Sequence, residues 1–131
     1  MMEVTYLDVI DAFHSRFTDR YEIPETLERH WFYESVQEFE LEVFPLLYNK
    51  TTEKFDKDDL PPAIVSTLGS MMYVRYLTRE LSRVLKLSGI VGKDLSITGS
   101  GDTKRVTNQE LIAERELVAQ MLSKYKISAM G

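Results

Sequence analysis

Apolar residues recur at intervals of three and four over four stretches of this 131-residue chain, and this spacing predicts four amphipathic helices. The first is expected from Thr5 to Phe17, with Thr5 as its N-cap and Asp8 in its first turn, where a carboxylate favours the free N–H groups. Its apolar stripe comprises Tyr6, Val9, Ile10, Phe13 and Phe17.

The second helix is expected to begin at Pro24, a residue suited to a first helical turn. It should end near Phe44, because Pro45 cannot continue a helix. Its predicted inner side comprises Leu27, Trp31, Val36, Phe39, Val43 and Leu47, and its outer side carries Glu34, Glu38, Glu40 and Glu42. The polar stretch from Asn49 to Asp59 predicts an exposed loop.

Pro61 and Pro62 open the third and longest predicted helix, which runs to Leu87 and should be about 39 Å long. Gly69 lies inside it and predicts a close crossing with another helix, since a mid-helix glycine otherwise costs about 1 kcal/mol. The apolar face comprises Ile64, Leu68, Met71, Met72, Leu77, Leu81, Val84 and Leu85.

After this helix, Leu95 and Ile97 alternate with polar residues, which predicts a short strand, and the glycines at 99 and 101 predict a turn. The run Thr107–Glu110 matches a capping box and is expected to open a last helix to Lys124. One charged residue, Glu114, interrupts its otherwise apolar face of Leu111, Val118, Met121, Leu122 and Tyr125. The tail from Lys126 to Gly131 is expected to be loose.

The predicted fold is therefore mainly α: a small four-helix bundle in a single domain, 1–131, with one long central helix, a short β-like extended loop, a C-terminal helix and a tail. The chain has no cysteine, so disulfides and thiolate metal sites are excluded. Its start lacks the basic region of a signal peptide, and no apolar run reaches the roughly 20 residues that span a bilayer.

Patterns typical of enzymes are missing. The two histidines, His14 and His30, have no neighbours at metal-ligand spacing, and neither HExxH nor GxSxG occurs. The Gly-rich run Gly99–Lys104 departs from the phosphate-binding GxxxxGK[ST] pattern. We therefore expect a non-enzymatic protein with no catalytic residue, cofactor or metal, unless folding places a histidine beside a carboxylate in a deep pocket.

Charge is split between the two halves of the chain. Residues 1–60 carry fifteen acids and six bases, and residues 61–131 carry six acids and ten bases. Such halves either pack front to back against other copies or neutralise each other within one monomer. The strongest cluster is a basic stripe on the third helix, formed by Arg75, Arg79, Arg83 and Lys86.

Three interpretations of the basic stripe stay open. It is a solvated face, or it pairs with an acidic face of Glu34, Glu38 and Glu42 on a neighbouring subunit, or it contacts nucleic-acid phosphates without sequence preference.

The segment Asp94–Lys104, DLSITGSGDTK, together with the QMLSKYK run at 120–126, resembles the head–tail connector family of tailed phages, also called adaptor or head-completion proteins. The resemblance is clearest over residues 60–131. It implies a mostly helical structural protein of the virion neck, made in the host cytoplasm, that forms a homo-oligomeric ring, typically of twelve copies. It implies no catalytic residue.

The resemblance also implies partners. Such a ring joins the portal protein at the capsid vertex to a stopper or tail-completion protein, and DNA passes through its channel. The segment that would dock on the portal is Lys126, Ile127, Ser128, Ala129, Met130 and Gly131, and the loop that would contact neighbours contains Leu95, Ile97, Lys104 and Arg105.

The basic stripe supports an alternative function, a small helical DNA-binding protein such as a terminase small subunit or a regulator. Against this alternative stand the net charge of −5 and the lack of a recognisable helix-turn-helix.

Overall fold

The computed structural model describes residues 3–17, 23–90 and 98–130, and the side chains of 3–17, 23–83 and 105–127. Its helices are α1 (Tyr6–His14), α2 (Glu25–Glu42), α3 (Ala63–Ile90) and α4 (Thr98–Met130). Two short strands, β1 (Tyr48–Asn49) and β2 (Lys54–Phe55), form an antiparallel hairpin. The predicted mainly helical fold with one long central helix is confirmed.

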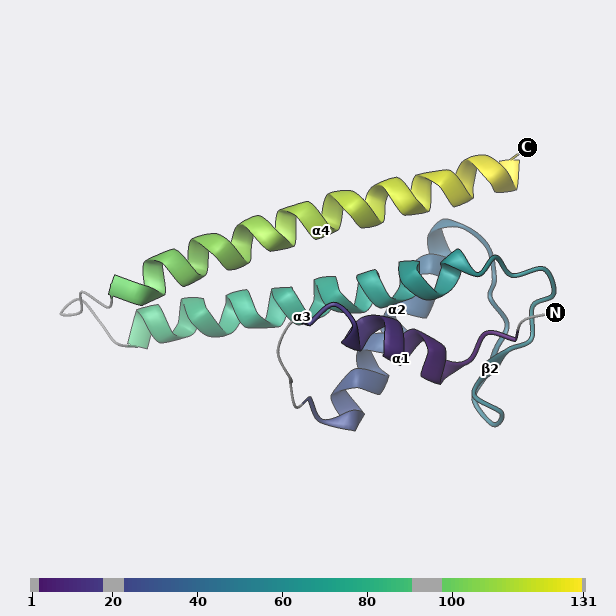
Figure 1. Cartoon of the computed structure of the whole chain (residues 1–131), viewed down its shortest axis with the longest axis horizontal. Coiled ribbons are helices and arrows are strands. Elements are labelled where there is room, and N and C mark those ends of the chain that lie inside the picture. Colours follow the sequence, from purple (N-terminus) through teal and green to yellow (C-terminus); the bar gives the residue numbers. More distant parts are fainter. Residues whose placement is uncertain (1–2, 18–22, 91–97, 131) are drawn as a thin grey trace.

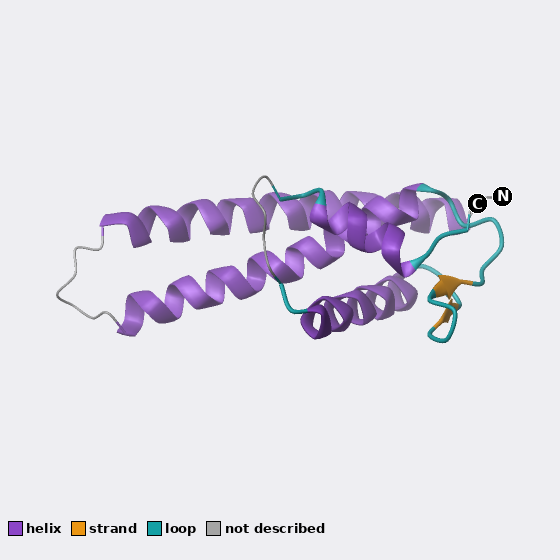
Figure 2. Ribbon diagram, turned by 60° about the horizontal axis from the view of Figure 1, so that its bottom comes forward, coloured by secondary structure: helices purple, strands orange, loops and turns teal. Residues whose placement is uncertain are grey.

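The helix α3 is the central element, and α1, α2 and α4 all pack on it (Figure 1). The helix α4 runs antiparallel along α3, and together they project beyond α1 and α2 (Figure 2). None of the described helices is apolar enough over a sufficient length to cross a membrane. The core lies where α1, α2 and α4 meet α3, and its fully buried side chains include Phe13, Phe32, Phe39, Leu68 and Met72.

Local signals set the starts of the first helices as expected. The Thr5 hydroxyl accepts a hydrogen bond from the Asp8 amide at 3.2 Å, and the Asp8 carboxylate accepts one from the Thr5 amide at 3.0 Å. This capping box fixes the start of α1. Pro24 is the N-cap of α2.

The end of α2 corrects one assignment. The helix stops at Glu42, and after Pro45 the buried position goes to Leu46, whereas Leu47 is 56% exposed and has a φ of 56°. The Leu46 amide donates to the Glu40 carboxylate at 2.8 Å, so Glu40 holds the chain as it leaves the helix. Leu47 was therefore wrongly placed on the inner side, because Pro45 breaks the helical period.

The predicted loop at 49–59 contains the hairpin instead. Tyr48 pairs with Phe55, and the Phe55 and Tyr6 amides donate to the Val4 and Glu53 carbonyls. The Phe32 ring packs against Tyr6, Tyr48 and Phe55, with centroid distances of 4.8, 4.9 and 5.9 Å. This aromatic packing, which local polarity does not reveal, stabilises so short a hairpin.

Gly69 marks a close helix crossing, as predicted. A Cβ atom at this position would lie 3.0 Å from the Ala12 Cβ and 3.1 Å from the Phe13 backbone nitrogen. The absence of a side chain therefore lets α1 lie directly against α3.

The start and the end of α4 differ from expectation. The backbone is helical from Thr98, so the predicted turn at 99–102 and the helix start at Thr107 were wrong, and the expected loose tail is helical to Met130. Isolated glycines lower helix propensity by only about 1 kcal/mol each and do not by themselves end a helix, and a capping-box sequence also fits the middle of a helix. The predicted strand residues Leu95 and Ile97 lie outside the described residues, as does Gly131.

Candidate partner-docking groove

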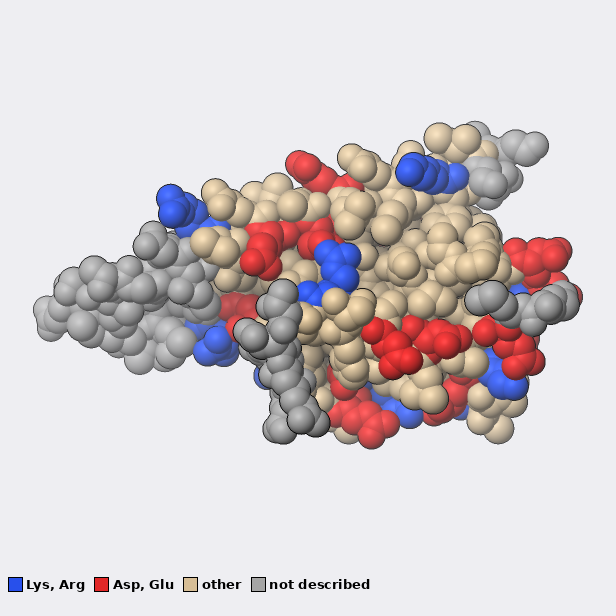
Figure 3. All heavy atoms as spheres, in the orientation of Figure 1, with Lys and Arg blue, Asp and Glu red and all other residues tan. Residues whose placement is uncertain are grey.

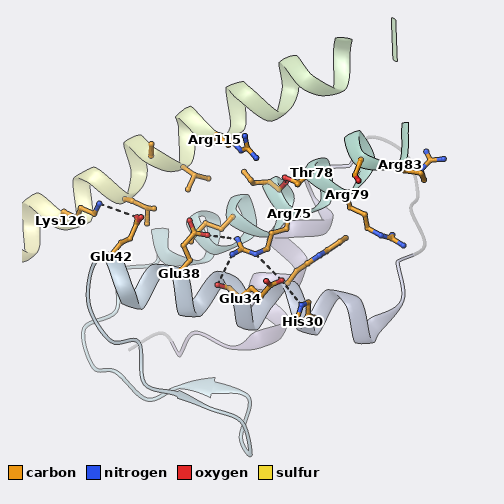
Figure 4. Close-up of a pocket in the computed structure, with 17 residues that line it drawn as sticks. His30, Glu34, Glu38, Glu42, Arg75, Thr78, Arg79, Arg83, Arg115 and Lys126 are labelled. Atoms are coloured by element: carbon orange, nitrogen blue, oxygen red, sulfur yellow. Dashed lines mark hydrogen bonds and ion pairs between the residues drawn. The ribbon is translucent and has the colours of Figure 1, made fainter. Parts of the chain in front are cut away.

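A groove of about 1090 Å³ lies between α2, α3 and α4 (Figure 4). Its floor is apolar: Val74 of α3 is partly exposed and Ala119 of α4 is exposed there, and the core residues Trp31, Met71, Val118 and Leu122 complete the lining. The helices α2 and α4 flank α3 but meet each other only weakly, which leaves the space between them open. Charged side chains from all three helices form the rim.

Arg75 binds the acidic wall of the groove. Its Nη1 lies 2.9 Å from Glu38 Oε1 and its Nε lies 3.8 Å from Glu34 Oε1, while Nη2 donates to the Glu34 carbonyl at 3.4 Å. The Arg75 side chain is 22% exposed. The basic stripe and the acidic face therefore meet at Arg75 within one chain. At this residue the opposite charges neutralise each other inside the monomer, which is one of the two arrangements that the charge split allowed.

Two further rim cations, Lys126 and Arg83, have partners close by. Lys126 of α4 lies 3.7 Å from Glu42 of α2, which links these two helices at one end of the groove. Arg83 pairs with Glu80 at 2.9 Å, one turn away on α3. Glu42 thus contacts the segment that the resemblance assigned to portal docking.

Two rim cations differ from these. Arg79 of α3 and Arg115 of α4 are exposed, and neither forms an ion pair in the described part of the chain. Among the described residues, five cations and three carboxylates line the groove, so the formal net charge of this lining is +2. The sequence did not single out Arg115, because on α4 alone it is an ordinary solvent-facing arginine.

The histidines lie beside carboxylates but at the surface. His30 Nε2 is 3.2 Å from Glu34 Oε1 on the groove rim, where the two side chains are 67% and 44% exposed. His14 lies outside the groove, half-exposed, with Nε2 2.5 Å from Glu28 Oε2. Within the described residues, no cluster of three His, Asp or Glu side chains could hold a metal ion. His30 and Glu34 therefore form a polar pair at the exposed rim of the groove.

The charged residue on the apolar face of α4 has a structural partner. The Arg16 guanidinium, at the end of α1, forms an ion pair with Glu114, donates to Ser70 Oγ of α3 at 3.1 Å, and lies over the Tyr73 ring. The Glu114 side chain is only 12% exposed. A carboxylate inside an apolar stripe is a signal that a cationic partner is required, although the sequence does not say which one.

The remaining predicted site residues are scattered. Arg105 is exposed on α4, in a helix and not in a loop, and Ile127 is 68% exposed near the end of the same helix. The backbone positions of Lys86, Lys104, Ser128, Ala129 and Met130 are helical, but their side chains lie outside the described part. Among the predicted site residues whose side chains are described, the structure brings together in one groove Arg75, Arg79, Arg83, Lys126 and the acidic face Glu34, Glu38 and Glu42.

Comparison with protein families, curated proteins and solved structures finds no match to this chain.

Proposed function

We propose that this chain is a structural, non-enzymatic subunit of a ring in the neck of a tailed phage. The ring would join the portal at the capsid vertex to the stopper or tail, with DNA passing through its channel. The observation that carries the proposal is the groove between α2, α3 and α4, which combines an apolar lining, including the partly exposed Val74 and the exposed Ala119, with an open charged rim. An apolar centre with a polar rim is the usual anatomy of a protein-docking surface.

The shape of the chain supports the same role. The paired ends of α3 and α4 project beyond α1 and α2, which gives the chain an elongated shape (Figures 1 and 2). A subunit in a ring needs at least two unlike contact surfaces, one for each neighbour. The family resemblance over residues 60–131 supplies the specific setting, a virion neck.

The DNA-binding alternative loses part of its support. Arg75 is held by Glu34 and Glu38, so the stripe presents fewer open cations than its sequence spacing indicates. The same rim also carries carboxylates, which repel phosphates.

Cryo-electron microscopy of virions from the phage that encodes this chain tests the proposal. We expect a ring of density that fits α3 and α4 between portal and tail. Necks in which the chain has no density would overturn it. A gel shift at about 50 mM salt that is lost in Arg79→Glu would favour the DNA-binding alternative instead.

A further inference from the structure

The outer face of α1 carries an exposed apolar side chain next to exposed carboxylates. Leu7 is 64% exposed on α1, and Asp8 and Asp11 are exposed beside it. Residues four apart on a helix are neighbours, so Leu7 and Asp11 lie one turn apart on the same face. Carboxylates gather over α1 in the space-filling view (Figure 3).

The acidic face and the groove lie on different surfaces of the molecule. None of the described α1 residues lines the groove, whose walls are α2, α3 and α4. In Figure 1, α1 lies in front of α3 and α2 lies behind it. One copy therefore cannot fill its own groove with its own α1 face.

The two surfaces match in chemistry. The α1 face presents an apolar side chain flanked by carboxylates, whereas the groove presents an apolar floor flanked by guanidinium groups. Asp11 forms no ion pair with any described residue, and the same is true of Arg79 and Arg115. Carboxylate and guanidinium groups make the strongest charge-assisted hydrogen bonds, so each surface supplies what the other lacks.

We propose that the groove between α2, α3 and α4 receives the outer face of α1 from a second copy of this chain, with Leu7 over the apolar floor and Asp11 at Arg79 and Arg115. The contact joins two unlike surfaces, so each copy receives one neighbour and offers α1 to the next. Such head-to-tail contacts close into rings or extend into filaments. This inference rests on the proposed function, because it names the contact that would build the ring.

Charge reversal tests the contact on the purified full-length chain. The groove variant Arg79→Glu/Arg115→Glu and the face variant Asp11→Lys should each self-associate at least about tenfold more weakly than the wild type, measured by analytical ultracentrifugation at low salt. In an equimolar mixture, each groove meets a face of opposite charge, so association should return. The exposed α4 changes Lys124→Glu and Glu116→Lys, outside the groove, should have no effect and serve as controls.

Cross-linking tests the same contact when association is weak. Since the chain has no cysteine, Asp11→Cys and Thr78→Cys each introduce a single thiol, and Thr78 is an exposed groove residue. A short thiol–thiol cross-linker should join the two variants to each other far more than either to itself, and Asp11→Cys with Glu116→Cys should give background only. Self-linking of Thr78→Cys alone would indicate a symmetric contact and would overturn the proposal, as would background linking in every mixture.

The two proposals fail in different ways. A ring present in virions, together with cross-linking at background, would leave the neck function intact and reject the α1 contact. Specific cross-linking with no neck density would support head-to-tail assembly and reject the neck function.

Discussion

The two sides of α3 differ in how they use the helix surface. On one side, Gly69 lets α1 approach to backbone contact, and Ser70 is buried under Arg16. On the other side, Arg75 and Arg79 line an open groove with exposed Thr78 and Ser82. Small residues permit close packing, whereas long charged residues keep neighbouring helices apart. The first side therefore packs closely against α1, whereas the second side leaves an open groove between α2 and α4.

The largest expected loss comes from removing Arg16 on the packed side. Arg16→Met leaves the buried Glu114 carboxylate without its cation, and we expect the free energy of unfolding to fall by about 3 kcal/mol. Urea denaturation measures this change. As a control, Arg115→Met removes the exposed groove arginine that follows Glu114 on α4. It should change the free energy of unfolding by less than about 0.5 kcal/mol.

A double variant separates lost pairing from lost packing. Arg16→Met/Glu114→Leu should recover more than half of the stability lost in Arg16→Met, because no buried charge remains. If the double variant is no more stable than the single one, the packed side does not depend on this ion pair.

The helix crossing provides the next largest effect. Gly69→Ala adds a methyl group against Ala12 and the Phe13 backbone, so we expect a loss of about 1 to 2 kcal/mol despite the better helix propensity of alanine. Thermal denaturation compared with Ser66→Ala, an exposed change on the same helix, isolates the crossing. A stabilised Gly69→Ala protein would mean that α1 moves easily on α3.

Arg75 tests the groove side directly. Arg75→Gln should cost only about 0.5 to 1 kcal/mol, since its partners Glu34 and Glu38 are 44% and 41% exposed and water can solvate them. The loss should shrink further in 1 M salt. A loss as large as that of Arg16→Met would show that both sides of α3 hold the monomer together.

An effect that is absent at neutral pH concerns the hairpin. Burial raises the pKa of Tyr48 to about 12 from its usual value of 10, and its hydroxyl has no hydrogen-bond partner among the described residues. The fold favours the neutral phenol, so this contribution to stability is complete below pH 10 and is lost as pH rises to 12. Between pH 10 and 12, the free energy of unfolding of Tyr48→Phe should therefore rise relative to that of the wild type by up to about 1 kcal/mol, as measured by urea denaturation. Below pH 10, the difference in free energy of unfolding between the two proteins should not depend on pH.

Local sequence signals identified most of the helix boundaries near the N-terminal half of the chain. The capping box at Thr5, the helix-ending Pro45 and the Pro61–Pro62 start of α3 all act within a few residues, and the structure bears them out. Gly69 also signalled its close crossing, because an interior glycine is costly unless space requires it.

The sequence by itself therefore determined where most helices form and which residues share a face, since both follow from the 3.6-residue period and from contacts between near neighbours. The tertiary structure alone decided which faces meet. It joined Arg75 to Glu38 across 37 residues and Arg16 to Glu114 across 98, and it left Arg79 and Arg115 open on the groove rim. Helical periodicity fixes the direction of a side chain around its own axis but carries no information about the neighbour that will lie opposite.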